Sequence, residues 1–168
     1  PKRVADYAAA FVRGHHAAGL LTSLKHFPGH GSSTADSHEG FVDITRTWKA
    51  TELAPYRRLI EAGLVDMVMV GHLYYAAYGA GSAQLPASLS PKWIEGVLRG
   101  ELGYAGVVVS DDLEMGAIRK RFSLEQSVIA SVKAGVDVLL FSNTASYDPG
   151  LAARVRGILV AEAERDPA

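Results

Sequence analysis

The sequence predicts an α/β fold built on parallel strands. Four short apolar stretches alternate with segments of helical periodicity, and the chain begins and ends with a helical segment. The apolar stretches are almost continuous in hydrophobic residues, which is typical of parallel strands buried on both faces. Each stretch also runs into polar residues at its carboxyl end, the edge at which parallel α/β sheets bind their ligands.

The helices are indicated by apolar spacing and by the residues at their ends. Apolar side chains recur at helical spacing over residues 4–12, and Gly19 is a suitable stop. Thr51 is placed to cap the second helix, and Ser123 with Gln126 forms a capping-box pattern for the fourth. The helices after the first are expected over residues 51–62, 90–100, 125–134 and 149–164.

The strands are expected where the apolar stretches lie, and each one ends in side chains that can do chemistry. The predicted strands cover residues 20–26, 65–72, 105–112 and 136–143. Their polar endings are Lys25-His26, His72, Ser110-Asp111 and Ser142-Asn143. Because the carboxyl ends of parallel strands meet at one edge, we expect these endings to gather on one face. Two long loops, residues 27–47 and 73–89, follow on that face, and loops of such length are usually functional or disordered.

Two architectures accommodate four strand–helix units in 168 residues. One is a doubly wound open sheet, which would be complete at this length. The other is part of a (β/α)₈ barrel, which normally takes about 250 residues, so that four strands would make half of it. The local pattern does not separate the two. In both, residues 1–168 form a single segment.

Composition excludes several classes of site and partner. The net charge of −1 gives no indication of a nucleic-acid partner or of an anionic membrane surface. The chain has no cysteine, so disulfides and thiolate metal sites are excluded. No apolar run approaches the roughly 20 residues that a membrane span needs. The compartment is left open, with a cytoplasmic location favoured.

Asp111 and the pair formed by Asp36 and His38 are the candidate catalytic residues. A carboxylate directly after a buried strand, like Asp111, is held rigidly and could act as a nucleophile, a base or a metal ligand; the structural alternative is a helix or turn cap. In the loop, the carboxylate of Asp36 can accept the imidazole N–H of His38 two residues later, which fixes the tautomer and suits proton transfer. The alternative for this pair is a surface loop with a turn-forming aspartate.

Lys25, His26 and His72 are candidate ligand-binding residues. Lys25 has three donors for a hydroxyl-rich or anionic ligand, while each histidine could equally be a satisfied core residue. A metal-dependent hydrolase is a further alternative, since histidines and aspartates collect at this edge. However, their spacing matches no ligand motif of the HExxH kind, so no metal and no cofactor is expected.

Two motifs carry a family resemblance. KHFPGHG followed by DSH, and VVVSDDLEMGA downstream, resemble the β-N-acetylglucosaminidases, or β-N-acetylhexosaminidases, of the family-3 glycoside hydrolases. The segments ELAPYRRLIEAGLVDMVMVGH and AGVDVLLFSN are similar to the same family, so the resemblance extends over most of the chain.

The resemblance implies a (β/α)₈ barrel enzyme that removes terminal β-linked N-acetylglucosamine, often from peptidoglycan fragments, with retention of configuration. It implies that Asp111 is the nucleophile, that His38 is the general acid/base and that Asp36 is its partner. It also implies that Lys25 and His26 contact sugar hydroxyls.

The family domain is about twice as long as this chain, and the matching motifs belong to its second half. We therefore expect residues 1–168 to be the C-terminal half of a catalytic barrel, with an N-terminal half as a possible partner. Four strand–helix units alone would leave open sheet edges. A non-catalytic carbohydrate-binding or assembly half-barrel remains the alternative, and on either interpretation the chain alone could be inactive.

Overall fold

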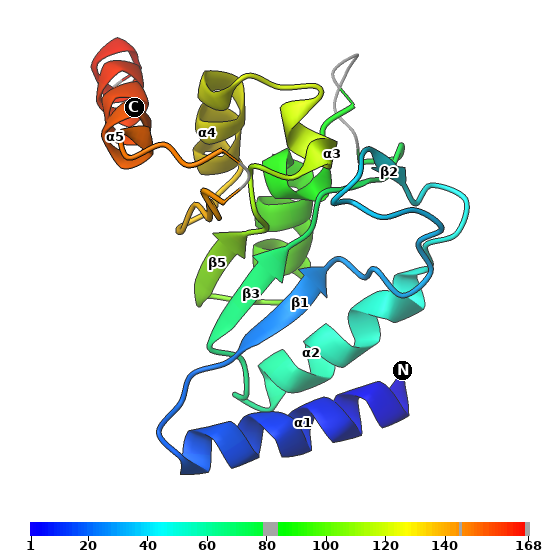
Figure 1. Ribbon diagram of the computed structural model, residues 1–168. Coiled ribbons are helices and arrows are strands. Elements are labelled where there is room, and N and C mark those ends of the chain that lie inside the picture. Colours follow the sequence, from blue (N-terminus) through cyan, green and yellow to red (C-terminus); the bar gives the residue numbers. More distant parts are fainter. Residues whose placement is uncertain (79–83, 145, 167–168) are drawn as a thin grey trace.

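Three parallel strands form the centre of the computed structural model, which describes residues 1–78, 84–144 and 146–166. The strands are β1 (Ser23–Phe27), β3 (Met67–Val70) and β5 (Val107–Ser110), with β3 in the middle (Figure 1). Val68 of β3 is in register with Leu24 on one side and Val108 on the other. The predicted parallel order is therefore confirmed for three of the four expected strands.

Helices pack against one face of this sheet, on which Val68 and Val70 of β3 are buried. The first helix, α1 (Lys2–Ala17), packs against α2 (Ala54–Glu61) beside β1 (Figure 1). The predicted helix over residues 90–100 is present as a π-helix, η4 (Lys92–Glu101). The remaining helices are α3 (Gly116–Arg119), α4 (Leu124–Lys133) and α5 (Leu151–Arg165), and α4 packs against α5. Of the described helices, none is long and apolar enough to cross a membrane.

Helix-end predictions had mixed outcomes. The capping box at Ser123 and Gln126 is confirmed, because each side chain binds the backbone N–H of the other residue. Gly19 and Gly63 follow their helices with φ values of 74° and 63°, a left-handed conformation that glycine adopts without strain. The cap predicted at Thr51 is wrong, because this residue lies inside a 3₁₀ turn, η1 (Ala50–Leu53), that precedes α2.

The predicted fourth strand, residues 136–143, is not a strand in the structure. It forms only an isolated bridge between Val138 and Val109, although its backbone runs beside β5. Backbone hydrogen bonds still join the two segments, from the N–H of Val138 to the carbonyl of Val108 at 3.1 Å and from the N–H of Ser110 to the carbonyl of Val138 at 2.9 Å, and two further N–H groups bind side chains. The carboxylate of Asp137 accepts the N–H of Val108 at 2.8 Å, and the Ser110 hydroxyl accepts the N–H of Leu140 at 2.9 Å.

The two long predicted loops contain a feature that the sequence pattern did not predict. Val42–Asp43 (β2) pairs in parallel with Leu73–Tyr74 (β4), so the two loops are joined to each other at the carboxyl edge of the sheet. Part of the second loop, residues 79–83, lies outside the described residues. The pairing gives the first loop a fixed end close to β3.

The main core lies between the sheet, α2 and η4. Phe27, Trp93, Ile94 and Leu98 are all at most 1% exposed, and the rings of Phe27 and Trp93 meet edge to face with centroids 5.9 Å apart. Burying a large apolar side chain stabilises the fold by about 1.5–3 kcal/mol. This core therefore fixes β1 and β3, whose carboxyl ends carry His26 and lead into His72.

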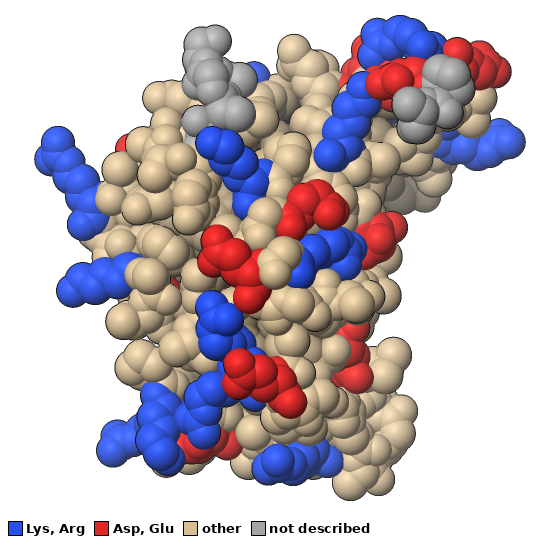
Figure 2. Space-filling model, turned by 180° about the vertical axis from the view of Figure 1, so that it is seen from behind, with Lys and Arg blue, Asp and Glu red and all other residues tan. Residues whose placement is uncertain are grey.

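Charged side chains are interspersed over the surface. The face shown in Figure 2 has basic and acidic residues side by side, in keeping with the net charge of −1. The fold thus offers no single-sign surface on this face, and the chemistry of interest lies at the strand ends.

Candidate functional site

Asp111 lies directly after β5 and is held by the backbone of the sheet. Its N–H donates to the carbonyl of Val70 at 3.0 Å, and the residue is only 7% exposed. Its Oδ1 accepts the N–H of Asp112 at 2.9 Å, while its Oδ2 lies 3.8 Å from Nε2 of His26. One carboxylate oxygen is thus fixed by the chain, and the other faces the end of β1. A rigid, nearly desolvated carboxylate of this kind is suited to nucleophilic attack.

His26 brings the end of β1 to the same place. Burial lowers the pKa of its imidazole, and the negative charge of Asp111 acts in the opposite direction. The ring of His30 lies edge-on to it, with centroids 5.7 Å apart. Lys25 is exposed at this strand end. The prediction that the ends of β1 and β5 meet is confirmed by the contact between His26 and Asp111.

Asp36 and His38 form a hydrogen-bonded pair on the first long loop. Oδ1 of Asp36 accepts from Nδ1 of His38 at 2.7 Å and from the His38 backbone N–H at 2.8 Å. These two bonds lower the pKa of Asp36, the backbone bond having the larger effect. Both side chains are exposed, His38 at 76% and Asp36 at 58%. The pairing leaves Nε2 of His38 as the ring atom that can exchange a proton with a ligand.

His72 is buried behind the strand ends. It is 1% exposed, and both of its ring nitrogens have partners, the Ser88 hydroxyl at 2.7 Å and the Asp112 carbonyl at 2.8 Å. Burial lowers the pKa of this imidazole. The geometry fits the core-histidine alternative better than the predicted contact with substrate, because neither nitrogen is left for a ligand.

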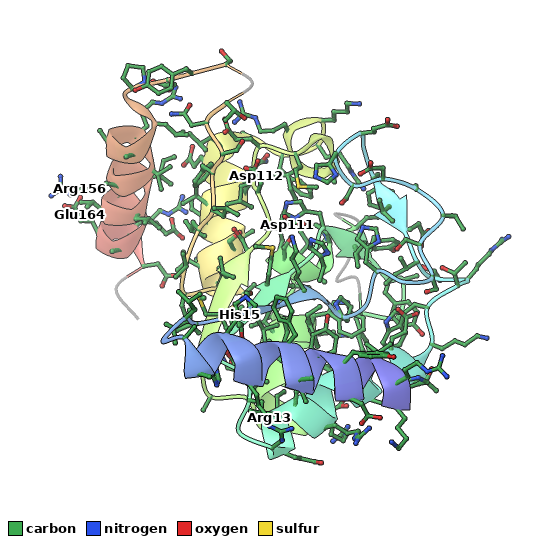
Figure 3. The ribbon with its side chains drawn as sticks, turned by 60° about the horizontal axis from the view of Figure 1, so that its bottom comes forward. Arg13, His15, Asp111, Asp112, Arg156 and Glu164 are labelled. Carbon is green, nitrogen blue, oxygen red and sulfur yellow. The ribbon has the colours of Figure 1, made fainter. Side chains whose placement is uncertain are left out.

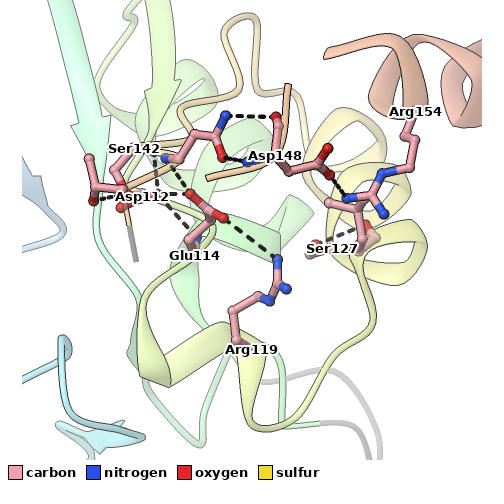
Figure 4. Close-up of polar contacts among 10 residues, drawn as sticks. Asp112, Glu114, Arg119, Ser127, Ser142, Asp148 and Arg154 are labelled. Atoms are coloured by element: carbon pink, nitrogen blue, oxygen red, sulfur yellow. Dashed lines mark hydrogen bonds and ion pairs between the residues drawn. The ribbon is translucent and has the colours of Figure 1, made fainter. Parts of the chain in front are cut away.

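Asp112 and Glu114 connect the end of β5 to the segment that follows α4 (Figure 4). Oδ1 of Asp112 accepts the N–H groups of Glu114 and Ser142 at 3.0 and 3.1 Å. The Glu114 carboxylate accepts the N–H of Asn143 and lies 4.0 Å from Arg119. Asp112 therefore positions its neighbours rather than facing the site. Glu114 was not a candidate from the sequence, where it reads as an ordinary charged residue in a turn.

The titratable groups of α1 lie apart from this cluster. Figure 3 shows Asp111 and Asp112 at the strand end, whereas Arg13 and His15 belong to α1. A groove of about 540 Å³ runs beside the site between α1, α2 and the free side of β1, and its lining includes Lys25 and His26. Within the described part of the chain, no three His, Asp or Glu side chains are grouped so that they could hold a metal ion.

Comparison with known proteins identifies relatives over almost the whole chain. Residues 1–164 match the family model described as the Glycosyl hydrolase family 3 N terminal domain. A Beta-hexosaminidase of Stenotrophomonas maltophilia (strain R551-3) is 41% identical over 154 residues, which cover 90% of this chain and 44% of that protein. A Beta-hexosaminidase of Xylella fastidiosa (strain 9a5c) is 42% identical over 156 residues, covering 91% and 45%.

Solved structures agree with these matches. The structure of Beta-N-acetylhexosaminidase from Beutenbergia cavernae DSM 12333 is 32% identical with a TM-score of 0.85, over 99% of this chain and 47% of that one. The predicted fold class, parallel βα units of the (β/α)₈ type, is confirmed by this likeness together with the parallel order of β1, β3 and β5. The chain spans less than half the length of each of these relatives.

Proposed function

Because this chain belongs to glycosyl hydrolase family 3, we propose that it is the half of a retaining β-N-acetylhexosaminidase barrel that carries the nucleophile and the acid/base. The proposed substrates are glycosides with a terminal β-linked N-acetylglucosamine, including fragments derived from peptidoglycan. A single observation carries the proposal. The carboxylate of Asp111 is held at the end of β5, and the loop that bears the hydrogen-bonded residues Asp36 and His38 is attached to the segment that follows the same strand.

In the first step, Oδ2 of Asp111 attacks the anomeric carbon and the bond from that carbon to the leaving oxygen breaks. The proton on Nε2 of His38 passes to the departing oxygen, so the aglycone leaves as a neutral alcohol. The carboxylate of Asp36 stabilises the protonated ring and holds it in the tautomer that keeps Nδ1 protonated afterwards. The product of this step is a glycosyl ester on Asp111.

In the second step, a water molecule replaces the aglycone. Nε2 of His38, now unprotonated, takes a proton from the water, and the water oxygen attacks the anomeric carbon as its bond to Asp111 breaks. Two inversions give net retention. The exposure of His38 supports this use of one residue twice, since it leaves the ring accessible to both an alcohol and a water.

Lys25 and His26 are proposed to bind sugar hydroxyls. Two observations support this: His26 faces Asp111, and the neighbouring Lys25 is exposed at the same strand end. Both ring nitrogens of His72 have partners within the protein, which supports a structural role for this residue behind the site.

Trapping the glycosyl ester tests the proposal. A 5-fluoro N-acetylglucosaminyl fluoride should label the active protein once per site, because the fluorine slows the hydrolysis of the ester. Peptide mass spectrometry should then locate the label on Asp111. Labelling of a different carboxylate, or turnover with inversion seen by NMR, would rule out this mechanism.

A non-catalytic half-barrel is the second candidate function. It is motivated by exposed apolar residues on α1, which indicate a surface for assembly. Val4, Tyr7 and Phe11 on α1 are 59%, 72% and 62% exposed, which is unusual for large apolar side chains that share one helix. We propose that another half-barrel covers them. The mass and the activity of the isolated chain should be measured with and without the N-terminal half of a relative. A stable, inactive monomer that gains no activity with the other half would favour a binding or assembly role.

A further inference from the structure

We infer that residues 116–121, here called the anchoring segment, position the loop that carries His38 for proton transfer above Asp111. The inference rests on the proposed role of His38 and extends it to residues that touch neither the sugar nor the reacting atoms. The anchoring segment follows the nucleophile in the chain and includes the short helix α3.

Three donors of the anchoring segment bind three consecutive carbonyls of the loop. The N–H of Gly116 donates to the carbonyl of His38 at 3.1 Å, and the N–H of Ala117 donates to that of Ser37 at 3.2 Å. Nζ of Lys120 donates to the carbonyl of Glu39 at 2.6 Å. The loop is thus held through its backbone at His38 itself and at both of its neighbours.

Burial of one loop residue and one side-chain contact add to the attachment. Ser37 is 3% exposed although Asp36 and His38 on either side of it are exposed, so the loop has a buried anchor between its two working residues. Further along the loop, the guanidinium of Arg121 lies over the ring of Phe41, 4.2 Å from its centroid. A cation over an aromatic face at this distance is attractive.

Gly116 is the position at which the attachment is most restrictive. A Cβ atom added there would lie 2.7 Å from the carbonyl oxygens of both His38 and Glu39. Real Cβ atoms do not approach backbone that closely, so any side chain must push the loop away from the strand end. Glycine at this position lets the two backbones come into direct hydrogen-bonding contact.

The internal chemistry of the pair does not depend on the anchoring segment. Both hydrogen bonds of the Asp36 carboxylate go to His38, two residues away, so the pair can stay intact when the loop moves as a unit. The anchoring segment therefore governs where His38 lies relative to Asp111, and leaves its tautomer and its bond to Asp36 unchanged. A loss of anchoring should therefore weaken proton delivery without breaking the bond between Asp36 and His38.

The test uses Gly116→Ala and Lys120→Met, with Gly157→Ala and Lys92→Met as matched controls. Nothing lies within 4 Å of a Cβ added at Gly157 in α5, and Lys92 is exposed on η4. Hydrogen exchange on the 168-residue chain should show faster exchange of the N–H groups of residues 116 and 117, which donate to the loop carbonyls, in both test variants and unchanged exchange there in both controls. Lys120→Arg, which keeps a donor, should restore slow exchange.

Turnover is measured in the form that cleaves aryl glycosides, the chain alone or together with the other half of the barrel. Both test variants should lose kcat on substrates with poor leaving groups by roughly 10- to 100-fold more than on activated aryl glycosides. For substrates with poor leaving groups, the pH dependence of kcat should keep its shape. A variant that broke the bond between Asp36 and His38 should change that shape.

His38→Ala separates the two possible failures. If His38→Ala shows the leaving-group selectivity and the two test variants do not, the anchoring inference is wrong and the proposed function stands. If His38→Ala loses activity equally on both substrate types, the proposed acid/base is wrong and the inference falls with it. Unchanged exchange at residues 116 and 117 in both Gly116→Ala and Lys120→Met would overturn the inference whatever the turnover shows.

Discussion

Oδ2 of Asp111 lies 3.8 Å from Nε2 of His26, across the space between the ends of β5 and β1. The central strand β3 lies between the two strands, so this contact spans the width of the sheet at its carboxyl edge. The distance is longer than a hydrogen bond, and the negative charge of Asp111 still acts on His26. A ligand atom bound between them would therefore meet a donor on one side and a carboxylate on the other.

Replacing the proposed nucleophile should abolish turnover. Asp111→Asn keeps the shape of the side chain and removes its charge, so the rate should fall by roughly 10⁴-fold or more on every substrate. Asp112→Asn is the matched control, because an asparagine Oδ1 can still accept the N–H groups of Glu114 and Ser142. Steady-state kinetics on an aryl glycoside measure both. Equal losses in the two variants would speak against a special role for Asp111.

Removing the imidazole of His38 should change which substrates are cleaved. His38→Ala should lower kcat on substrates with poor leaving groups by about 10²- to 10⁴-fold, the usual contribution of a general acid. Activated aryl glycosides need little protonation, so their first step should be affected far less. Added azide should then speed up release of the sugar, because it attacks the glycosyl ester without needing a base. No effect of azide, together with equal losses on both substrate types, is the contrary result.

The stability of the chain should fall as the pH falls. Burial lowers the pKa of both His26 and His72, so the unfolded state binds protons more readily than the folded state does. The free energy of unfolding should therefore decrease as the pH drops below about 6.5, the ordinary pKa of histidine, and should change little from this source above about pH 7.5. Thermal melts at a series of pH values measure this.

Variants at and beside His72 isolate its contribution to the pH dependence of stability. His72→Asn should make the slope of melting temperature against pH shallower below about pH 6.5, because one titrating group is lost. Ser88→Ala removes the hydroxyl partner of His72 and keeps the titrating ring, so it should lower stability while the slope remains. A slope that is the same in His72→Asn as in the unmodified chain would contradict the assignment.

The core between the sheet and η4 should be sensitive to loss of volume. Leu98 has no exposed surface, and Leu98→Ala should lower the free energy of unfolding by about 2–5 kcal/mol through lost burial and a cavity. Val132→Ala on α4 is the control, since Val132 is 44% exposed and its truncation should cost well under 1 kcal/mol. Chemical denaturation measures both. A small loss for Leu98→Ala would show that the core can collapse around the gap.

Those features that depend on local pattern could be predicted from the sequence. The apolar stretches of β3 and β5 and the capping box at Ser123 follow from periodicity and end chemistry, and each is present. The fourth segment could not be predicted in this way. Backbone hydrogen bonds join it to β5, but the N–H groups of Val108 and Leu140 bind the side chains of Asp137 and Ser110 and no full ladder forms. An apolar stretch does not indicate whether its N–H groups will bind backbone carbonyls or side chains.

The candidate site shows the same division. The pair of Asp36 and His38 was predictable because both residues sit within three positions of one loop. The occupied state of His72 was not, since its two partners come from Ser88 and Asp112, 16 and 40 residues away. The role of Gly116 was likewise hidden, because the backbone that it approaches lies in a distant part of the chain.

The two working groups of the proposed site are supported in different ways, and this has a consequence for how such a protein can diverge. Asp111 depends on the packing of the whole sheet, whereas the bonds between Asp36 and His38 lie within a single tripeptide. Insertions or substitutions elsewhere in the loop can alter the reach of His38 and leave its hydrogen bond to Asp36 intact. New leaving groups can therefore be accommodated during evolution by changing the loop, while the carboxylate and the sheet beneath it remain as they are.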